Sequence, residues 1–305
     1  MTSTSSFGEH RDLLFSVAYR ILGSAADAED VMQDAWLKWS AADRSLVADP
    51  RAYLVRIVTN TAMDRLRSAR ARRETYVGPW LPEPILTASP DPASLDPASP
   101  DPAEVAESVS VALLVVLESL SPLERAVFVL REAFGFDYAE IADAVGRSAG
   151  AVRQAGVRAR AHVSDRRPRF PATRARHREV TERFFAAATG GDLNTLMELL
   201  APDVTLWTDG GGKVRQAMRP VAGAERVAAW FAGVATRPYE GVHPAEMAAE
   251  VVDLNGAPGV VFRGAGRVIG TLTLDLGDDG RIAAIHNVAN PDKLAAVATR
   301  EVHPV

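Results

Sequence analysis

The strongest constraint on how this chain folds is a proline-rich stretch that contains no basic residue. Residues 74–124 contain no lysine, arginine or histidine, and eight of the chain's 19 prolines stand between Pro79 and Pro102, in PWLPEP and a repeated DPAS/DPA segment. Proline removes a backbone donor, and acidic low-complexity sequence cannot bury enough apolar surface to order itself. We therefore expect residues 74–108 to be a stiff linker with no packed core or regular ladder, joining separately folded modules.

Composition excludes several classes of protein. The chain has no cysteine, so disulfides, thiol catalysis and cysteine-based metal sites are absent. No apolar run approaches the length of a membrane span, and the first residues, MTSTSSFGEH, lack the basic and apolar blocks of a signal peptide. With 47% hydrophobic residues each module can build a core. We expect a cytoplasmic protein with no metal or other cofactor and no membrane contact.

The region before the linker predicts helices only. Ser24 and Asp27 form a capping pair before the amphipathic run DAEDVMQDAWLKW, and Asp49 followed by Pro50 marks the start of a long helix. That helix ends in an arginine cluster of the kind that contacts nucleic acid. The cluster consists of Arg65, Arg67, Arg70, Arg72 and Arg73.

The region after the linker is helical again. Ser121 with Glu124 and Asp137 with Glu140 form capping boxes, the second opening a short helix that Gly146 ends. Ser148 caps a longer helix that runs to about residue 163, so the spacing predicts a helix-turn-helix. A second basic tract begins here: Arg147, Arg153, Arg158, Arg160, Arg166, Arg167, Arg169, Arg174, Arg176 and Arg178.

The last region changes to mixed α and β. Two helices stopped by Gly190-Gly191 and Pro202 precede a strand, and the runs VVDL, VVFRGAG, VIGTLTLDL and IAAIHNV predict four more strands. The alternation in TLTLDL, residues 271–276, favours one buried face. A curved sheet wrapped around helices is expected.

Together these segments resemble a known family. DAEDVMQDAWLKW with PRAYLVRIVTNTAMDRLRSARARR is similar to the first domain of extracytoplasmic-function sigma factors of the sigma-70 family, and SPLERAVFVLREAFGFDYAEIADAVGRSAGAVRQAGVRARAHV to their second. The remainder resembles a SnoaL-like domain, a cystatin/NTF2-like α+β cone. One subgroup of these sigma factors carries that fusion with three signatures, here WLPEP at 80–84, DGGGK at 209–213 and NPDKL at 290–294.

The resemblance implies a fold class and four regions. The expected fold is multidomain, with two all-α modules, the second a helix-turn-helix, followed by the α+β cone. The regions are a sigma-2 domain (1–73), a linker containing WLPEP (74–108), a sigma-4 domain (109–168) and a SnoaL-like regulatory domain (169–305). The implied function is promoter-specific initiation of transcription, by a protein that is not an enzyme and acts as a monomer.

The resemblance also implies two partners, core RNA polymerase and promoter DNA. The polymerase is contacted at the clamp helices of its largest subunit and at its flap. The exposed polar contacts would be Asp30, Gln33 and Asp34, with Val31, Ala35 and Leu37 buried beneath them. The minus-ten element would meet Arg56, Asn60, Arg67 and Arg70, whereas Asp64 would pair with a neighbouring arginine.

The minus-thirty-five element would meet the recognition helix. Gln154 can pair bidentately with adenine, and Arg153 or Arg158 with guanine or phosphate. The full set is Arg147, Ser148, Arg153, Gln154, Arg158 and Arg160. At Ala155-Gly156 the chain departs from the family's usual larger pair, which puts the usual base contacts in doubt.

For the third region, the resemblance implies regulation by docking between the signatures. The residues expected to take part are Trp80, Leu81, Pro82, Asp209, Gly210, Lys213, Asn290, Asp292 and Lys293. The resemblance leaves open whether the cone also binds a small-molecule ligand. Two alternatives also stay open: a ligand-responsive helix-turn-helix regulator, and a SnoaL-like cyclase or isomerase whose acid–base groups would be Asp209, His243, Asp275 and His286.

Overall fold

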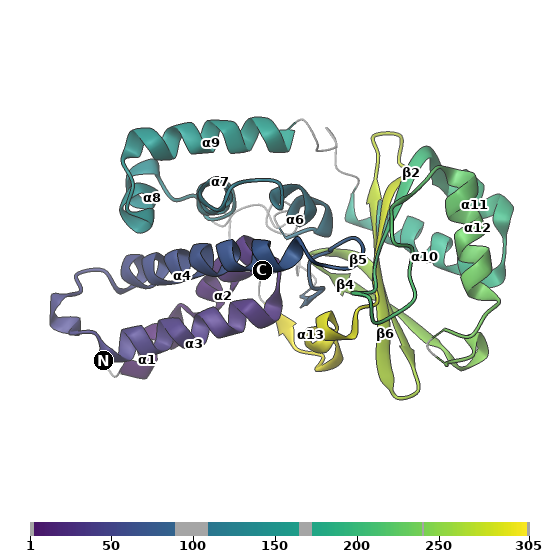
Figure 1. The fold of residues 1–305 in the computed structure, drawn as a ribbon, viewed down its shortest axis with the longest axis horizontal. Coiled ribbons are helices and arrows are strands. Elements are labelled where there is room, and N and C mark those ends of the chain that lie inside the picture. The colour runs from purple at the N-terminus through teal and green to yellow at the C-terminus, as the bar shows by residue number, and fades with distance from the viewer. Residues whose placement is uncertain (1–2, 89–108, 165–172, 240, 304–305) are drawn as a thin grey trace. The chain divides into compact units, whose positions relative to one another are not determined.

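The computed structural model describes residues 3–88, 109–164, 173–239 and 241–303 (Figure 1). Their contacts form two compact units. The first contains described residues 3–74 and 109–164 with residue 303, and the second contains residues 75–88 and 173–302. The DPAS repeat and three arginines of the second basic tract (Arg166, Arg167 and Arg169) lie outside the described residues.

The first part of the first unit is a helical bundle. Its elements are α1 (Ser3–Glu9), α2 (Arg11–Leu22), α3 (Ala25–Ala41), the 3-10 turn η1 (Arg44–Leu46) and α4 (Pro50–Arg73). Two of the predicted caps are present: Ser24 Oγ accepts from Asp27 N at 3.0 Å, and Asp49 Oδ1 accepts from Ala52 N at 3.1 Å. Because α2 packs against both α3 and α4, its own side chains are almost all buried (Figure 1).

The second part of the first unit contains the predicted helix-turn-helix. Its elements are α6 (Val111–Leu117), α7 (Pro122–Phe128), the π-helix η3 (Val129–Ala133), α8 (Tyr138–Val145) and α9 (Ala149–Ser164). Both capping boxes are present, and Gly146 adopts a left-handed φ of 62° between α8 and α9. Helix α4 contacts α7 and α8, so the two helical modules pack against each other.

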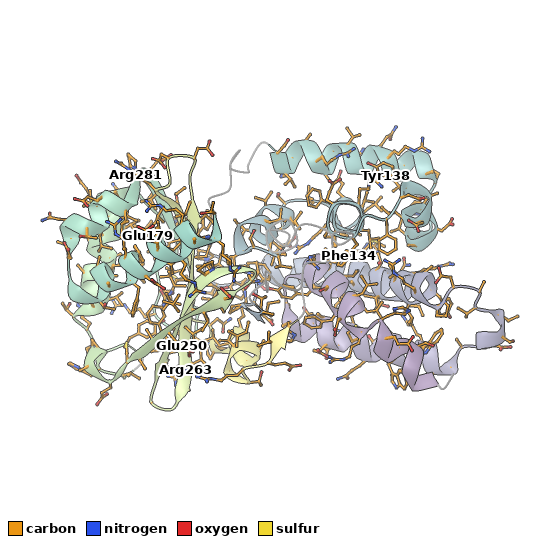
Figure 2. All side chains as sticks on the ribbon, turned by 180° about the vertical axis from the view of Figure 1, so that it is seen from behind. Phe134, Tyr138, Glu179, Glu250, Arg263 and Arg281 are labelled. Carbon is orange, nitrogen blue, oxygen red and sulfur yellow. The ribbon has the colours of Figure 1, made fainter. Side chains whose placement is uncertain are left out.

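The unusual Gly156 has a packing reason. A Cβ at this position would stand 3.2 Å from the ring and hydroxyl of Tyr138 and 3.4 Å from Val127 (Tyr138 is labelled in Figure 2). Gly156 and Ala155 are both buried on the inner side of α9. The departure from the family pattern therefore lets the recognition helix approach α7 and α8 closely, and it leaves the exposed side of α9 unchanged.

The second unit combines helices with a curved sheet. The helices α10 (Arg174–Gly190), α11 (Leu193–Leu199) and α12 (Ala224–Ala235) lie on one face (Figure 1). The main strands are β2 (Leu200–Asp209), β4 (Ala248–Leu254), β5 (Ala257–Gly264), β6 (Arg267–Leu276) and β7 (Ile282–Val288). The short elements are β1 (Leu86–Thr87), β3 (Val221–Ala222), η4 (Pro244–Glu246), η5 (Pro291–Lys293), α13 (Ala295–Ala298) and β8 (Val302–His303).

The sheet follows the order β3-β2-β7-β6-β5-β4-β1-β8. Strands β2 and β7 run parallel, whereas the neighbours from β7 to β1 run antiparallel. The four strands predicted after the first one are all present. Helix α12 was not predicted.

The expectation for the linker was wrong over residues 75–88. Leu81 and Ile85 are completely buried, and Leu86 pairs with Leu254 of β4, so this segment contributes both a core and a ladder to the second unit. Asn255 holds this segment against the end of β4, because its N donates to Ile85 O at 3.0 Å and its Oδ1 accepts from Ile85 N at 3.2 Å. Proline is tolerated here because only two residues enter the ladder.

One smaller expectation was also wrong. Thr271 and Thr273 of β6 are buried like Leu272 and Leu274, so TLTLDL does not have a single buried face. The predicted stop at Pro202 agrees with the structure, because α11 ends at Leu199 with Leu200 as its C-cap and Pro202 follows two residues later.

Candidate functional site

The residue predicted to read the minus-ten element is engaged within the first unit. Asn60 lies on α4, where its side-chain amide donates to Ala144 O of α8 at 2.6 Å and to Arg56 O at 2.8 Å. Arg56 is exposed. The neighbouring arginine that pairs with Asp64 is Arg67, which was itself predicted to contact DNA. The side chain of Arg70 lies outside the described residues.

Two buried arginines connect the helical modules. Arg125 of α7 is completely buried, donates its Nε to Arg20 O at 3.1 Å and pairs with Glu118. Arg20 of α2 places its guanidinium 4.7 Å from the ring of Phe134, and burial lowers its pKa to about 10. Nothing in their spacing distinguished these arginines from the solvent-facing ones, so sequence reasoning missed them.

The predicted polymerase-contacting residues lie exposed on α3. Asp30, Gln33 and Asp34 are all exposed, and Asp30 forms an ion pair with Arg65. Val31 and Ala35 are buried as expected, but Leu37 is 63% exposed, so the prediction that it is buried was wrong. The face therefore presents an apolar side chain beside its acidic ones.

The recognition helix α9 presents a mixed exposed face. Arg147, Ser148, Arg153 and Gln154 are exposed, and Val157 is an exposed apolar residue on the same helix. Arg158 and Arg160 are partly engaged: Arg158 Nε lies 2.7 Å from Glu124 Oε1, and Arg160 donates to Tyr138 OH at 3.0 Å.

The end of the second basic tract serves a different purpose. Arg174 and Arg178 lie on α10 of the second unit and pair with Asp253 at 2.5 and 3.2 Å, while Arg176 pairs with Glu179 at 2.9 Å. Arg174 and Arg178 thus connect α10 to β4, and Arg176 forms an ion pair within α10. Sequence proximity alone had grouped them with the recognition helix.

The three signatures meet around the carboxylate of Asp209, which is completely buried. Its Oδ2 accepts from Leu81 N at 2.9 Å and from Lys293 Nζ at 2.7 Å. Its Oδ1 accepts from the Tyr76 hydroxyl and from Gly211 N at 3.1 Å. We call Tyr76, Trp80, Leu81, Asp209, Gly211, Asn290 and Lys293 the signature cluster.

Lys293 is the cation of the signature cluster. Besides Asp209 it donates to Leu81 O at 2.6 Å, and its ammonium lies 4.1 Å from the ring centre of Trp80 and 4.8 Å from that of Tyr76. Only 8% of its side chain is exposed. The expected polar surface at Asp209 and Lys293 is therefore a buried network, since hydrogen bonds and aromatic faces replace the water that a lysine would otherwise keep.

Tyr76 was not predicted to belong to the site. It precedes WLPEP, and its hydroxyl accepts from Asn290 Nδ2 at 2.8 Å while donating to Asp209. Burial and the neighbouring Asp209 carboxylate raise the pKa of Tyr76 above its ordinary value. Nothing in its local sequence marked it, because only the fold brings residue 76 together with residues 209 and 290.

The glycines of DGGGK permit close approach. A Cβ on Gly211, whose φ is 58°, would lie 2.3 Å from Asn290 Nδ2, and a Cβ on Gly212 would lie 3.0 Å from Val77. Outside this contact, Lys213 Nζ lies 2.6 Å from Asp292 Oδ2 in an exposed ion pair. Gly210 closes the turn by accepting from Lys213 N and Val214 N, so the motif is both a turn and a docking surface.

The four acid–base candidates do not form a catalytic group. Asp209 is held in the signature cluster, and His243 caps η4. Asp275 Oδ2 and His286 Nδ1 lie 3.5 Å apart. His286 is paired with Thr273, one residue from the cavity-lining pair Leu272 and Asn287, so by strand alternation it points to the opposite face.

Two further findings concern metal ions and membranes. The described residues contain no group of three or more histidine, aspartate or glutamate side chains placed to hold a metal ion. Nowhere in the described part of the chain is a helix both long and apolar enough to cross a lipid bilayer.

Two family models match the helical modules. The model for Sigma-70 region 2 matches residues 7–72, and the model for Sigma-70, region 4 matches residues 110–163. The matches cover the bundle of α2 to α4 and the helix-turn-helix of α8 and α9.

Whole-length relatives extend the match through the second unit. The ECF RNA polymerase sigma factor SigJ of Mycobacterium tuberculosis is 40% identical over 310 residues, covering 97% of this chain and 95% of the relative. A probable ECF RNA polymerase sigma factor from the same species, SigI, is 32% identical and covers 95% of this chain and 94% of its own. The crystal structure of M. tuberculosis SigJ matches with a TM-score of 0.73 at 36% identity, covering 96% of this chain and 98% of that one. The predicted fold class of two all-α modules, the second a helix-turn-helix, followed by an α+β domain is confirmed.

Proposed function

This chain belongs to the extracytoplasmic-function RNA polymerase sigma factors of the sigma-70 family, and we propose that its second unit regulates when its helical modules reach a promoter. Sigma factors bind core polymerase and promoter DNA and are regulators of transcription, not enzymes; this chain is one of them. The proposed divisions are residues 1–73 for core and minus-ten binding, 74–108 for the linker, 109–168 for minus-thirty-five binding and 169–305 for regulation. It acts as a monomer beside the polymerase in the cytoplasm.

The observation that carries the need for regulation is the contact of Asn60 with Ala144 O, which joins the two helical modules within the first unit. The amide of Asn60 has two N–H groups, and both are engaged, one by Ala144 O and one by Arg56 O, so neither is available to a base while this contact lasts. The arrangement is a closed state, in which the minus-ten reader of one module is occupied by the other. Promoter binding then requires the modules to separate. Buried Arg125 makes the contact between them polar. A polar contact suits reversible opening, because polar interfaces between domains are weaker than apolar cores.

The polymerase contacts are assigned to α3. Its exposed carboxylates at Asp30 and Asp34, the amide of Gln33 and the side chain of Leu37 would dock on the clamp helices, with the flap as the second contact. In the same way Arg56, Arg67 and Arg70 are assigned to minus-ten DNA. Arg153 and Gln154 are assigned to bases of the minus-thirty-five element, with Arg147, Ser148, Arg158 and Arg160 on its phosphates.

The second unit acts through the tether between the modules. Residues 75–88 are packed into that unit by the signature cluster and by β1. An extended chain spans at most roughly 3.3–3.6 Å per residue, so immobilising these 14 residues withdraws roughly 46–50 Å of possible reach. Release of the segment would lengthen the tether and let the modules separate.

The alternatives have weaker support. A cyclase or isomerase needs an acid or base in its cavity, and none of the four candidates lines it. A simple helix-turn-helix regulator leaves the Sigma-70 region 2 module, residues 7–72, without a role.

Run-off transcription with purified core polymerase tests the closed state. The chain has no cysteine, so a variant with Arg51→Cys and Phe136→Cys has a single pair of thiols, placed where the Arg51 guanidinium of α4 lies 5.0 Å from the ring of Phe136 in the other module. We expect a reducible thiol cross-linker to abolish transcription and reductant to restore it, with each single-cysteine variant unaffected by the cross-linker. Equal transcription from the cross-linked variant would disprove the need for opening, and failure of the unmodified chain to bind core polymerase would disprove the function itself.

A further inference from the structure

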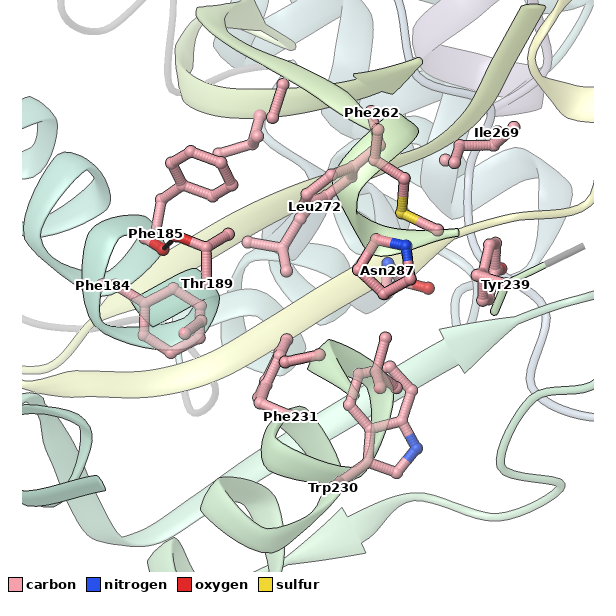
Figure 3. Close-up of a pocket in the computed structure, with 18 of the residues that line it drawn as sticks. Phe184, Phe185, Thr189, Trp230, Phe231, Tyr239, Phe262, Ile269, Leu272 and Asn287 are labelled. Atoms are coloured by element: carbon pink, nitrogen blue, oxygen red, sulfur yellow. Dashed lines mark hydrogen bonds between the residues drawn. The ribbon is translucent and has the colours of Figure 1, made fainter. Parts of the chain in front are cut away.

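The second unit contains an apolar cavity, partly open to solvent, between its helices and its sheet. The cavity has a volume of about 210 Å³ and is walled by α10, α12, β5 and β6. Figure 3 shows the aromatic side chains that line it: Phe184, Phe185, Trp230, Phe231, Tyr239 and Phe262. An apolar cavity of roughly 150 Å³ accepts benzene, so this one has room for a molecule somewhat larger than a single ring.

The cavity has no charged wall. Among the described residues that line it there is no aspartate, glutamate, lysine, arginine or histidine. A charged ligand would lose its hydration on entering and gain no counter-charge, which costs several kcal/mol or more in an apolar site. The cavity therefore selects uncharged molecules.

Two side-chain amides in the cavity wall favour a ligand that carries a hydrogen-bond donor. Gln216 donates its Nε2 to Tyr239 OH at 2.5 Å, and Asn287, which is 8% exposed, donates its Nδ2 to Thr271 O at 3.4 Å. With their N–H groups turned toward the protein, Gln216 Oε1 and Asn287 Oδ1 are buried without any hydrogen-bond partner. Buried acceptors without a partner cost free energy that a ligand donor would recover.

The same two amides adjoin the signature cluster along the chain. Gln216 comes three residues after Lys213, and a Cβ on Gly210 would lie 2.9 Å from Gln216 Cγ. Asn287 comes three residues before Asn290 at the end of β7. The cavity and the cluster that holds residues 75–88 thus share two chain segments.

We propose that this cavity binds a small, uncharged, mainly aromatic molecule of about two fused rings carrying one hydroxyl or N–H group, which donates to Gln216 Oε1 or Asn287 Oδ1. Its role as a signal rests on the regulatory function proposed above. A ligand shifts that equilibrium only if it binds the docked and released arrangements differently, and the shared segments provide a physical route for such a difference.

Three matched probes test the ligand class on the full-length chain by titration calorimetry. 2-Naphthol has two rings and one donor, naphthalene has the rings alone, and 2-naphthoate carries a charge. We expect 2-naphthol to bind at least about tenfold more tightly than naphthalene, because one buried acceptor gains its partner, and 2-naphthoate not to bind. Equal binding of 2-naphthol and naphthalene, binding of 2-naphthoate, or binding of none of the three overturns the proposal.

Variants locate the binding. Ala188→Phe fills the cavity and should abolish 2-naphthol binding, whereas Asn287→Leu together with Gln216→Leu should remove the preference for 2-naphthol over naphthalene. Circular dichroism and the thermal midpoint identify any variant that fails to fold, and Ala188→Leu is a smaller substitution that should weaken binding in proportion to the volume it fills. Undiminished binding by a folded Ala188→Phe chain overturns the assignment to this cavity.

A separate measurement concerns the regulatory role. Run-off transcription is compared with and without saturating 2-naphthol, for the unmodified chain and for Ala188→Phe. A ligand-dependent change in the unmodified chain alone supports both proposals. Binding with unchanged transcription upholds the ligand class and contradicts the regulatory function, so the two failures can be told apart.

Discussion

Two lysine–aspartate pairs join the same two signatures in different surroundings. Lys293 of NPDKL meets Asp209 of DGGGK at 2.7 Å with 8% and 0% of their side chains exposed, whereas Lys213 of DGGGK meets Asp292 of NPDKL at 2.6 Å with 54% and 62% exposed. Their charges and separations are almost the same. The comparison teaches that burial, not contact distance, decides how much the loss of one partner changes the free energy of folding. Water competes for the exposed outer pair, Lys213 and Asp292, but does not reach the buried inner pair, Lys293 and Asp209.

The first unit contains a similar contrast. Arg125 is completely buried between the helical modules, while Arg158 of α9 pairs with Glu124 with 61% of its side chain exposed. The buried arginine holds two modules together, and the exposed one can exchange its carboxylate for a phosphate at little cost. Arginines that look alike in the sequence thus divide into buried structural ones and solvent-exposed ones.

The largest expected effect follows from removing the inner cation. Lys293→Met should destabilise the second unit by about 3–5 kcal/mol, because it leaves the Asp209 carboxylate buried without its counter-charge. Denaturant unfolding followed by tryptophan fluorescence measures it. A double variant, Lys293→Met with Asp209→Leu, should recover part of the loss; a loss below about 1 kcal/mol in the single variant would contradict the comparison.

A second effect concerns the close approach of the signatures. Gly211→Ala should cost about 2–3 kcal/mol, since it places a Cβ on a residue with φ of 58° and against Asn290. Gly280→Ala is the matched control, with φ of 75° and nothing within 4 Å of the added Cβ, and should cost only about 1 kcal/mol. Equal losses in thermal unfolding would show that the contact with Asn290 contributes nothing.

A smaller effect isolates one hydroxyl. Tyr76→Phe keeps the ring beneath Lys293 but removes the hydrogen bonds to Asp209 and from Asn290, so we expect a loss of about 1–2 kcal/mol. Limited proteolysis within residues 75–88 should also become faster as the segment is released more often. Unchanged proteolysis with unchanged stability would remove Tyr76 from the cluster.

The smallest effect is expected at the outer pair. Lys213→Met should change stability by less than about 1 kcal/mol, and the difference should vanish as salt is raised, because exposed charges are screened. It is the same substitution as Lys293→Met, in the other signature. A loss as large as that of Lys293→Met would mean that burial is not the deciding variable.

Local sequence signals were sufficient for the helical modules. The capping boxes at Ser121 and Asp137, the cap at Ser24 and the turn at Gly146 all have their predicted form, because each depends on residues within four positions of one another. The strands of the second unit were likewise predictable from their alternation and turns. The linker was not predictable: its prolines indicated an isolated segment, but Leu81 and Ile85 are completely buried, and their backbone N–H groups donate to Asp209 and Asn255, more than 100 residues away in sequence.

The sequence by itself determined the helices, the order of the modules and the three signatures, since caps, periodicity and short motifs act over a few residues. Only the tertiary structure decided which charges are buried, that Asn60 meets Ala144, that Tyr76 completes the signature cluster and that no charged residue lines the cavity of the second unit. Those outcomes depend on burial and on contacts between distant segments. The free energy of a charge or an amide is set by what surrounds it in space.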